Sequence, residues 1–100
     1  MSLLSQIVAE EKDRIKKMIS EYEQELGTLP KGTLVGKKVK DKQYFYLQFR
    51  EGKKTVSCYV GCKADIVDEL RERIKRRKHI EAMLKALKTE YTQAVKITGE

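Results

Sequence analysis

The stretch QYFYLQFREGKKTVSCYV, residues 43–60, reads as two β-strands joined by a tight turn at Glu51-Gly52. A two-residue turn here predicts four facing pairs: Leu47 with Val56, Phe45 with Cys58, Tyr46 with Ser57, and Tyr44 with Tyr59. This register places apolar side chains on one face and tyrosines, hydroxyls and Arg50 on the other. We therefore expect a hairpin with an apolar face and a polar, aromatic face.

A first strand is expected just before the hairpin, at residues 33–40, which makes a three-stranded antiparallel meander. Which face of the sheet its side chains join depends on the length of the loop that connects it to the next strand. A two- or four-residue connection puts Val39 opposite Tyr44, whereas a three-residue loop with a bulge puts it opposite Phe45. We favour the second register because it buries the strand's valines with the phenylalanines. It sends two lysines to the tyrosine side, Lys38 and Lys40.

Long amphipathic helices are expected on both sides of the sheet. Apolar residues recur at helical spacing over residues 2–26, and Gly27 with Pro30 ends this helix because glycine accepts a left-handed cap conformation. Residues 65–97 contain no glycine or proline, so they form one helix or two helices with a bend near Lys78-His79. Asp65 is the expected N-cap, with Asp68 three residues further on.

The fold class that follows is α+β in a single domain, residues 1–100, with the sheet at 33–60 and the helices packed as an antiparallel hairpin. The second helix carries a heptad seam: Ile66, Leu70, Arg73, Arg77, Ile80, Leu84, Leu87, Tyr91 and Ala94. Its two arginines need carboxylates, which the first helix could supply from Glu10, Glu11 or Glu21.

The net charge of +7 is concentrated in the sheet. Residues 31–63 hold nine Lys/Arg against two Asp/Glu. Such a field attracts polyanions and speeds their encounter with the protein. The alternative is that these lysines only keep an open sheet from pairing with other sheets.

No apolar run approaches the length of a membrane span, and the N-terminus turns acidic too early for a secretory signal. We expect a cytoplasmic protein with no membrane partner. Cys58 and Cys62 would close only a very short loop, so reduced thiols are expected.

Catalytic, metal and cofactor chemistry are not indicated. The single histidine, His79, lies in a basic helical stretch, the carboxylates are scattered, and the two cysteines lack a second ligand pair. The glycines fall at turns, without a phosphate-binding loop. We expect neither an enzyme, nor a metal site, nor a cofactor.

The basic and aromatic surface of the sheet is the candidate site. A narrow strand ribbon can enter a major groove, where Gln and Arg reach base edges and lysines contact phosphates, and tyrosines can stack on unpaired bases. The sheet residues are Lys38, Lys40, Tyr44, Tyr46, Gln48, Arg50, Lys53, Lys54, Thr55, Ser57 and Tyr59. Three basic residues on one side of the second helix could add phosphate contacts: Arg71, Lys75 and Lys78. In the competing interpretation a helix covers the tyrosines as core.

Four short motifs resemble those of a small, uncharacterised family of bacterial and phage-associated proteins: Lys31-Gly32, Tyr44-Phe45-Tyr46-Leu47, Arg50-Glu51-Gly52-Lys53 and Tyr59-Val60-Gly61. The resemblance covers residues 29–78. More loosely, the region resembles the three-stranded N-terminal DNA-binding domain of tyrosine-recombinase integrases, in which a sheet followed by a helix contacts DNA. That likeness implies DNA rather than RNA as the ligand, and a link to mobile elements or phage.

The leading hypothesis is therefore a non-enzymatic nucleic-acid-binding protein. The alternative is a coiled-coil protein interaction or assembly module with no nucleic-acid role, in which an overhanging second helix exposes apolar groups such as Tyr91 and Val95. Both hypotheses allow a homodimer formed through the helices.

Overall fold

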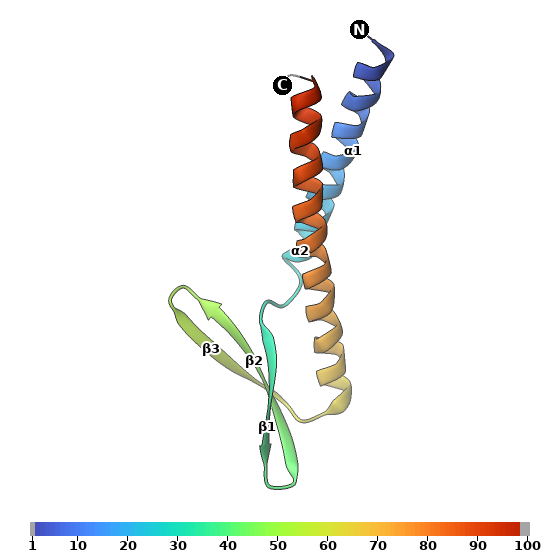
Figure 1. Ribbon diagram of the computed structural model, residues 1–100. Helices are drawn as coiled ribbons and strands as arrows, with labels where there is room; N and C mark the ends of the chain where they lie inside the picture. The colour runs from blue at the N-terminus through green and yellow to red at the C-terminus, as the bar shows by residue number, and fades with distance from the viewer. Residues whose placement is uncertain (1, 99–100) are drawn as a thin grey trace. The chain divides into compact units, whose positions relative to one another are not determined.

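The computed structural model describes residues 2–98, which form two helices and one antiparallel sheet (Figure 1). The elements are α1 (Leu3–Leu26), β1 (Thr33–Val39), β2 (Lys42–Glu51), β3 (Lys54–Gly61) and α2 (Ala64–Thr98). The predicted α+β class and the order of elements are confirmed. The chain divides into two compact units, one made by α1 with the part of α2 after Lys78, and one made by residues 29–78.

In the helical unit, α1 lies beside the second part of α2 (Figure 1). Near the end of α1, Oε1 of Glu23 lies 3.6 Å from Nζ of Lys88. Near the start of α1, Ile7 lines the same cavity as Ile97 of α2. The two helices therefore run in opposite directions, as the predicted helical hairpin requires. The buried core of this unit consists of Ile15, Ile80, Leu84, Leu87 and Ala94.

Helix α2 is continuous over 35 residues, so the single-helix alternative is the one observed. Its first hydrogen bond runs from the amide of Val67 to the carbonyl oxygen of Lys63, 3.1 Å away. The prediction of Asp65 as N-cap is therefore wrong. Asp65 lies inside the first turn, where its negative charge still complements the helix dipole.

The predicted seam of α2 is correct after Lys78 and wrong before it. Ile66 is 46% exposed, while Val67 and Ile74, outside the predicted seam, are 3% and 7% exposed. The buried stripe changes phase because the two parts of α2 belong to different units. Near the position where the buried stripe changes phase, Arg77 donates from Nη1 to the carbonyl oxygen of Leu29 at 2.9 Å.

The ends of α1 are capped by hydroxyl groups. The hydroxyl of Ser2 accepts from the amide of Ser5 at 3.2 Å, and that of Thr28 donates to the carbonyl oxygen of Glu25 at 2.7 Å. Gly27 has a right-handed conformation, with φ −64°, so the predicted left-handed cap is wrong.

Among the carboxylates of α1 that were expected to pair with the seam arginines of α2, Glu11 pairs with Arg14 of its own helix. Neither helix within residues 2–98 has an apolar stretch able to span a bilayer.

Strand β2 lies between β1 and β3, and the β2–β3 turn is Gly52-Lys53 instead of the predicted Glu51-Gly52. Leu47 faces Cys58 and Tyr46 faces Tyr59. The predicted partners are therefore wrong by two residues. Because strand side chains alternate with a period of two, this slip leaves the side chains of the four predicted pairs on their predicted faces.

The favoured register of β1 is wrong, and the alternative register has the observed facing although Val39 does not pair with Tyr44. A two-residue turn at Lys40-Asp41 pairs Val39 with Lys42, so Lys37 lies opposite Tyr44 and joins the tyrosine side, while Lys38 points to the other side. Val35 and Val39 also lie with the tyrosines and not with the phenylalanines.

Two residues explain the observed β1 register. Lys40 adopts a positive φ of 57°, which allows the short turn. Gly36 lies opposite Phe45, and a side chain there would place Cβ 3.2 Å from the Phe45 ring. Glycine thus leaves room for that ring across β1.

Gly32→Ala is expected to destabilise the fold. Gly32 has φ +135°, and an added Cβ would lie 2.4 Å from the carbonyl oxygen of Gln48. We expect a loss of about 1–3 kcal/mol in the free energy of unfolding, measured by urea denaturation. Gly27→Ala is the matched control, because Gly27 has an ordinary φ and an added Cβ would come no closer than 3.5 Å to its neighbours, so it should stabilise by about 0.5–1 kcal/mol. Equal effects of the two substitutions would contradict the backbone constraint at Gly32.

Candidate functional site

The two faces of the sheet differ in what covers them. The guanidinium carbon of Arg71 in α2 lies 5.9 Å from the ring centroid of Phe45. A cavity of about 400 Å³ is lined by both elements and the segment before α2: Lys42, Gln43 and Phe45 of β2, Cys62 between β3 and α2, and Ala64, Val67, Asp68 and Arg71 at the start of α2. Within residues 29–78, the start of α2 therefore lies on the phenylalanine side of the sheet. The tyrosines are not the surface it covers.

The opposite surface is called the tyrosine face below. The strand pairings place twelve side chains on it: Thr33, Val35, Lys37 and Val39 of β1, Lys42, Tyr44, Tyr46, Gln48 and Arg50 of β2, and Thr55, Ser57 and Tyr59 of β3. Tyr59 is 60% exposed and Val39 is 55% exposed, while Tyr44 and Tyr46 are half-buried. The face thus presents aromatic and apolar surface together with three exposed cations, Lys37, Lys42 and Arg50.

The three tyrosines of this face form one cluster. The Tyr46 and Tyr59 ring centroids are 5.5 Å apart in an edge-to-face arrangement, and those of Tyr44 and Tyr59 are 6.3 Å apart and tilted. Aromatic rings favour these offsets because the positive edge of one meets the negative face of another. Lys37 adds a cation–π contact, with Nζ 5.3 Å from the Tyr46 centroid. Each ring is thereby held against a neighbour.

A β-bulge at Val60 directs the chain away from the tyrosine face. Tyr46 pairs with Tyr59 and Phe45 pairs with Gly61, so Val60 is the extra residue. Gly61 has φ +125°, a conformation suited to glycine. The bulge puts Gly61 on the phenylalanine side, three residues before α2 begins. Sequence reasoning missed this bulge, although a glycine closing a strand is the signal that could have indicated it.

The predicted site residues separate into several groups. Tyr44, Tyr46, Gln48, Arg50 and Tyr59 lie on the tyrosine face as expected, and Lys53 lies in the turn at its Arg50 end. Lys38 and Lys54 lie on the phenylalanine side, and Lys40 lies in a turn, so the predicted grouping of these lysines with the tyrosines is wrong. For Lys38 and Lys40 the physical reason is the Lys40-Asp41 turn, which sets the parity of β1. Lys54 lies on the phenylalanine side because it pairs with Glu51, an odd-numbered residue of β2 like Phe45 and Phe49.

The helical residues of the predicted site do not join this face either. Arg71 lies against Phe45, and Lys75 lies 3.5 Å from Glu72 of its own helix. Lys78 is exposed at the end of the same unit. Lys37 is the residue that the sequence analysis missed, and the signal was present. With a two-residue turn, the odd-numbered residues of β1 share the tyrosine side.

Charge is divided sharply between the two units. Residues 29–78 contain 15 Lys/Arg and 6 Asp/Glu, a net charge of +9, whereas the rest of the chain has a net charge of −2. The unit that carries the tyrosine face is therefore the polycationic one. A field of this kind favours binding of polyanions at low salt.

The cysteines and acidic groups do not form a metal site in the part of the chain that the structure describes. Within residues 2–98, no three His, Cys, Asp or Glu side chains come together as ligands. Cys58 and Cys62 are exposed free thiols, and His79 is exposed on α2.

Residues 8–72 match a protein family described as a domain of unknown function (DUF6788). The chain belongs to this family. The matched region includes most of α1, the whole sheet and the first turns of α2, so the tyrosine face and its bulge are part of the DUF6788 domain. No curated protein and no solved structure matches the chain. The likeness to integrase domains therefore stays a prediction.

The tyrosine cluster should show itself in a pH titration. Partial loss of water, together with the nearby Cys62, Tyr44 and Tyr46, raises the pKa of Tyr59 above its ordinary value of 10.0. The folded protein thus holds this proton more tightly than the unfolded chain. The resulting stabilisation is present below the unfolded pKa and is lost as pH rises through the folded one.

In an absorbance titration of the folded protein, we expect a late step, in which one tyrosine ionises at a pH above the ordinary pKa of 10.0. Tyr59→Phe should remove this late step. The same substitution should make stability less sensitive to pH above about 10. Tyr22→Phe in α1 is the control and should leave the late step in place, because Tyr59 is intact. A late step that survives in Tyr59→Phe would contradict this assignment.

Proposed function

We propose that the protein is a non-enzymatic, cytoplasmic nucleic-acid-binding protein that uses the tyrosine face, with DNA favoured over RNA by the integrase likeness. The observation that carries the proposal is an aromatic sheet surface left open beside α2, inside a unit of net charge +9. The negatively charged phosphate backbone of a nucleic acid would bind the positive charge of this unit, and its bases would stack on the tyrosine rings.

The distribution of side chains supports a division of labour. Lys37 and Arg50 are exposed cations on the face, and Lys53 lies in the adjoining turn, so these groups can contact phosphates. Thr55 and Ser57 provide hydroxyl donors on β3. The face also has the rings of Tyr44, Tyr46 and Tyr59. A base can stack on such a ring, whereas a phosphate is bound by cations alone. Charge alone, as a means of solubility, would not require the aromatic cluster.

Neighbouring lysines of β1 give a direct test. Lys37 lies on the tyrosine face and Lys38 lies on the other side, although both are exposed and carry the same charge. We expect Lys37→Ala and Arg50→Ala each to weaken binding to a mixed pool of duplex and single-stranded oligonucleotides, and to reduce the salt slope by about one. Lys38→Ala should change binding much less. Fluorescence anisotropy at ~50 mM and ~200 mM salt measures these effects.

Two results would refute the proposal. One is the absence of binding to any oligonucleotide in the pool at the lower salt concentration. The other is an equal loss in Lys37→Ala and Lys38→Ala, because this would show that binding depends on total charge and not on the tyrosine face.

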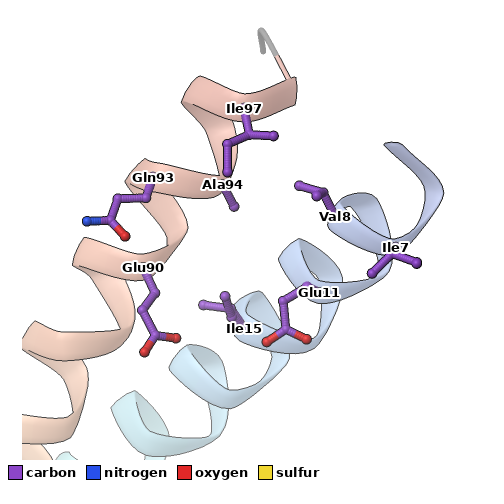
Figure 2. A pocket seen from close by; sticks show the side chains of 8 residues that line it. All are labelled: Ile7, Val8, Glu11, Ile15, Glu90, Gln93, Ala94 and Ile97. Atoms are coloured by element: carbon purple, nitrogen blue, oxygen red, sulfur yellow. The ribbon is translucent and has the colours of Figure 1, made fainter. Parts of the chain in front are cut away.

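A second candidate function, assembly through the helices, is favoured by the open end of the helical unit. There the two helices border a cavity of about 370 Å³, and Val8, Ala94 and Ile97 lie around the opening between them (Figure 2). Leu3, Leu4 and Ile97 are 74%, 67% and 69% exposed. The predicted exposed groups, Tyr91 and Val95, are half-buried instead.

The partner that fits this end is a second copy of the chain. Two antiparallel helices that expose apolar side chains at the same end can bury them against an identical pair about a two-fold axis, which gives a four-helix bundle. We expect analytical ultracentrifugation to show a dimer that Ile97→Lys abolishes. Ile66→Lys is the matched control, since Ile66 is an exposed isoleucine outside this end. A monomer at all concentrations would exclude this function.

A further inference from the structure

We infer that the ligand of the tyrosine face is an unpaired nucleic-acid strand, with a base stacked on the exposed ring of Tyr59. This inference rests on the proposed function and names its ligand class. It follows from how the rings are held, what lies at the middle of the face, and where the cations lie relative to the rings.

Tyr59 is the ring best placed for stacking. It is 60% exposed, yet it meets Tyr46 edge-to-face at 5.5 Å and Tyr44 at 6.3 Å. Neighbours on two sides restrict the ring while leaving much of its surface in water. A ring fixed before binding loses little conformational entropy when a base stacks on it. The exposed apolar surface also gains from being covered.

The middle of the face favours an unpaired base over a duplex. Reading a duplex requires hydrogen-bonding side chains aimed at base edges in a groove. Here the middle of the face is the Tyr46–Tyr59 pair, with Val35 opposite Tyr46 on β1. Paired bases hide their ring faces in the helical stack, whereas an unpaired base offers its ring face to a tyrosine. The ring cluster is therefore complementary to a single strand.

The cations lie around the rings at distances that suit a backbone running along the sheet. Lys37 is in cation–π contact with Tyr46. Arg50 lies four residues further along β2 than Tyr46, roughly 13 Å at the usual strand rise. The backbone of a short single strand can therefore contact Lys37 and Arg50 while one base stacks on Tyr59 between them. Val39, 55% exposed on the same face, adds apolar surface for a second base or a sugar.

The test compares ring removal with ring retention. Binding of labelled oligo-dT, oligo-rU and a duplex of the same length is measured by anisotropy for wild type, Tyr59→Phe and Tyr59→Ala. We expect either single strand to bind wild type more tightly than the duplex. Tyr59→Ala should weaken single-strand binding by roughly 5- to 100-fold, and Tyr59→Phe should stay within about 2-fold, because stacking needs the ring and not the hydroxyl.

A readout on wild type guards against misfolding of the alanine variant. Unlabelled oligo-dT should quench the intrinsic tyrosine fluorescence of the wild-type protein as a base stacks on the cluster. Equal or tighter duplex binding, an unchanged affinity in Tyr59→Ala, or a lack of quenching on saturation would each overturn the inference. Those outcomes leave the proposed function intact if Lys37→Ala still weakens binding. Failure of every oligonucleotide to bind would instead remove the proposed function itself.

Discussion

The pairing of β1 with β2 is the constraint on which the candidate site depends. Lys40 takes a positive φ, which permits a two-residue turn, and Gly36 accepts the Phe45 ring across the strand. Together these two positions set the parity of β1. Because neighbouring strand residues point to opposite faces, parity alone decides that Lys37 contacts the tyrosine cluster and Lys38 does not. A shift of one residue would exchange these two lysines and replace the valines of the face with other side chains.

The bulge at Val60 has the complementary role at the far edge of the sheet. It puts Gly61 on the phenylalanine side, and α2 begins three residues later beside Phe45. Without an extra residue, the chain would leave β3 with the opposite parity. The bulge therefore helps to keep the start of α2 off the tyrosines. A sheet of three strands has only two faces, and within residues 29–78 the start of α2 lies on one of them.

Helix α2 shows how a single regular element can serve two units. Its buried positions follow one phase at Val67 and Ile74 and another from Ile80 onward. A strict heptad pattern cannot describe both parts, because each part buries its own stripe in its own unit. The buried stripe changes phase where the charge also changes. The unit of residues 29–78 is strongly basic, and the helical unit is mildly acidic. Nucleic-acid binding and self-association would thus use separate parts of the molecule.

The sequence by itself determined the elements, the two faces of the β2–β3 hairpin and the concentration of positive charge, because each is a local or periodic property of the chain. Tyr44, Tyr46, Gln48, Arg50 and Tyr59 were assigned to one face correctly, since alternation survives a register slip of two residues. The sequence did not determine which β1 lysine joins them, whether α2 covers the tyrosines, or the phase of the seam before Lys78. These depended on one turn, one bulge and the packing of the start of α2. Such features are decided by tertiary contacts whose energies no single segment contains.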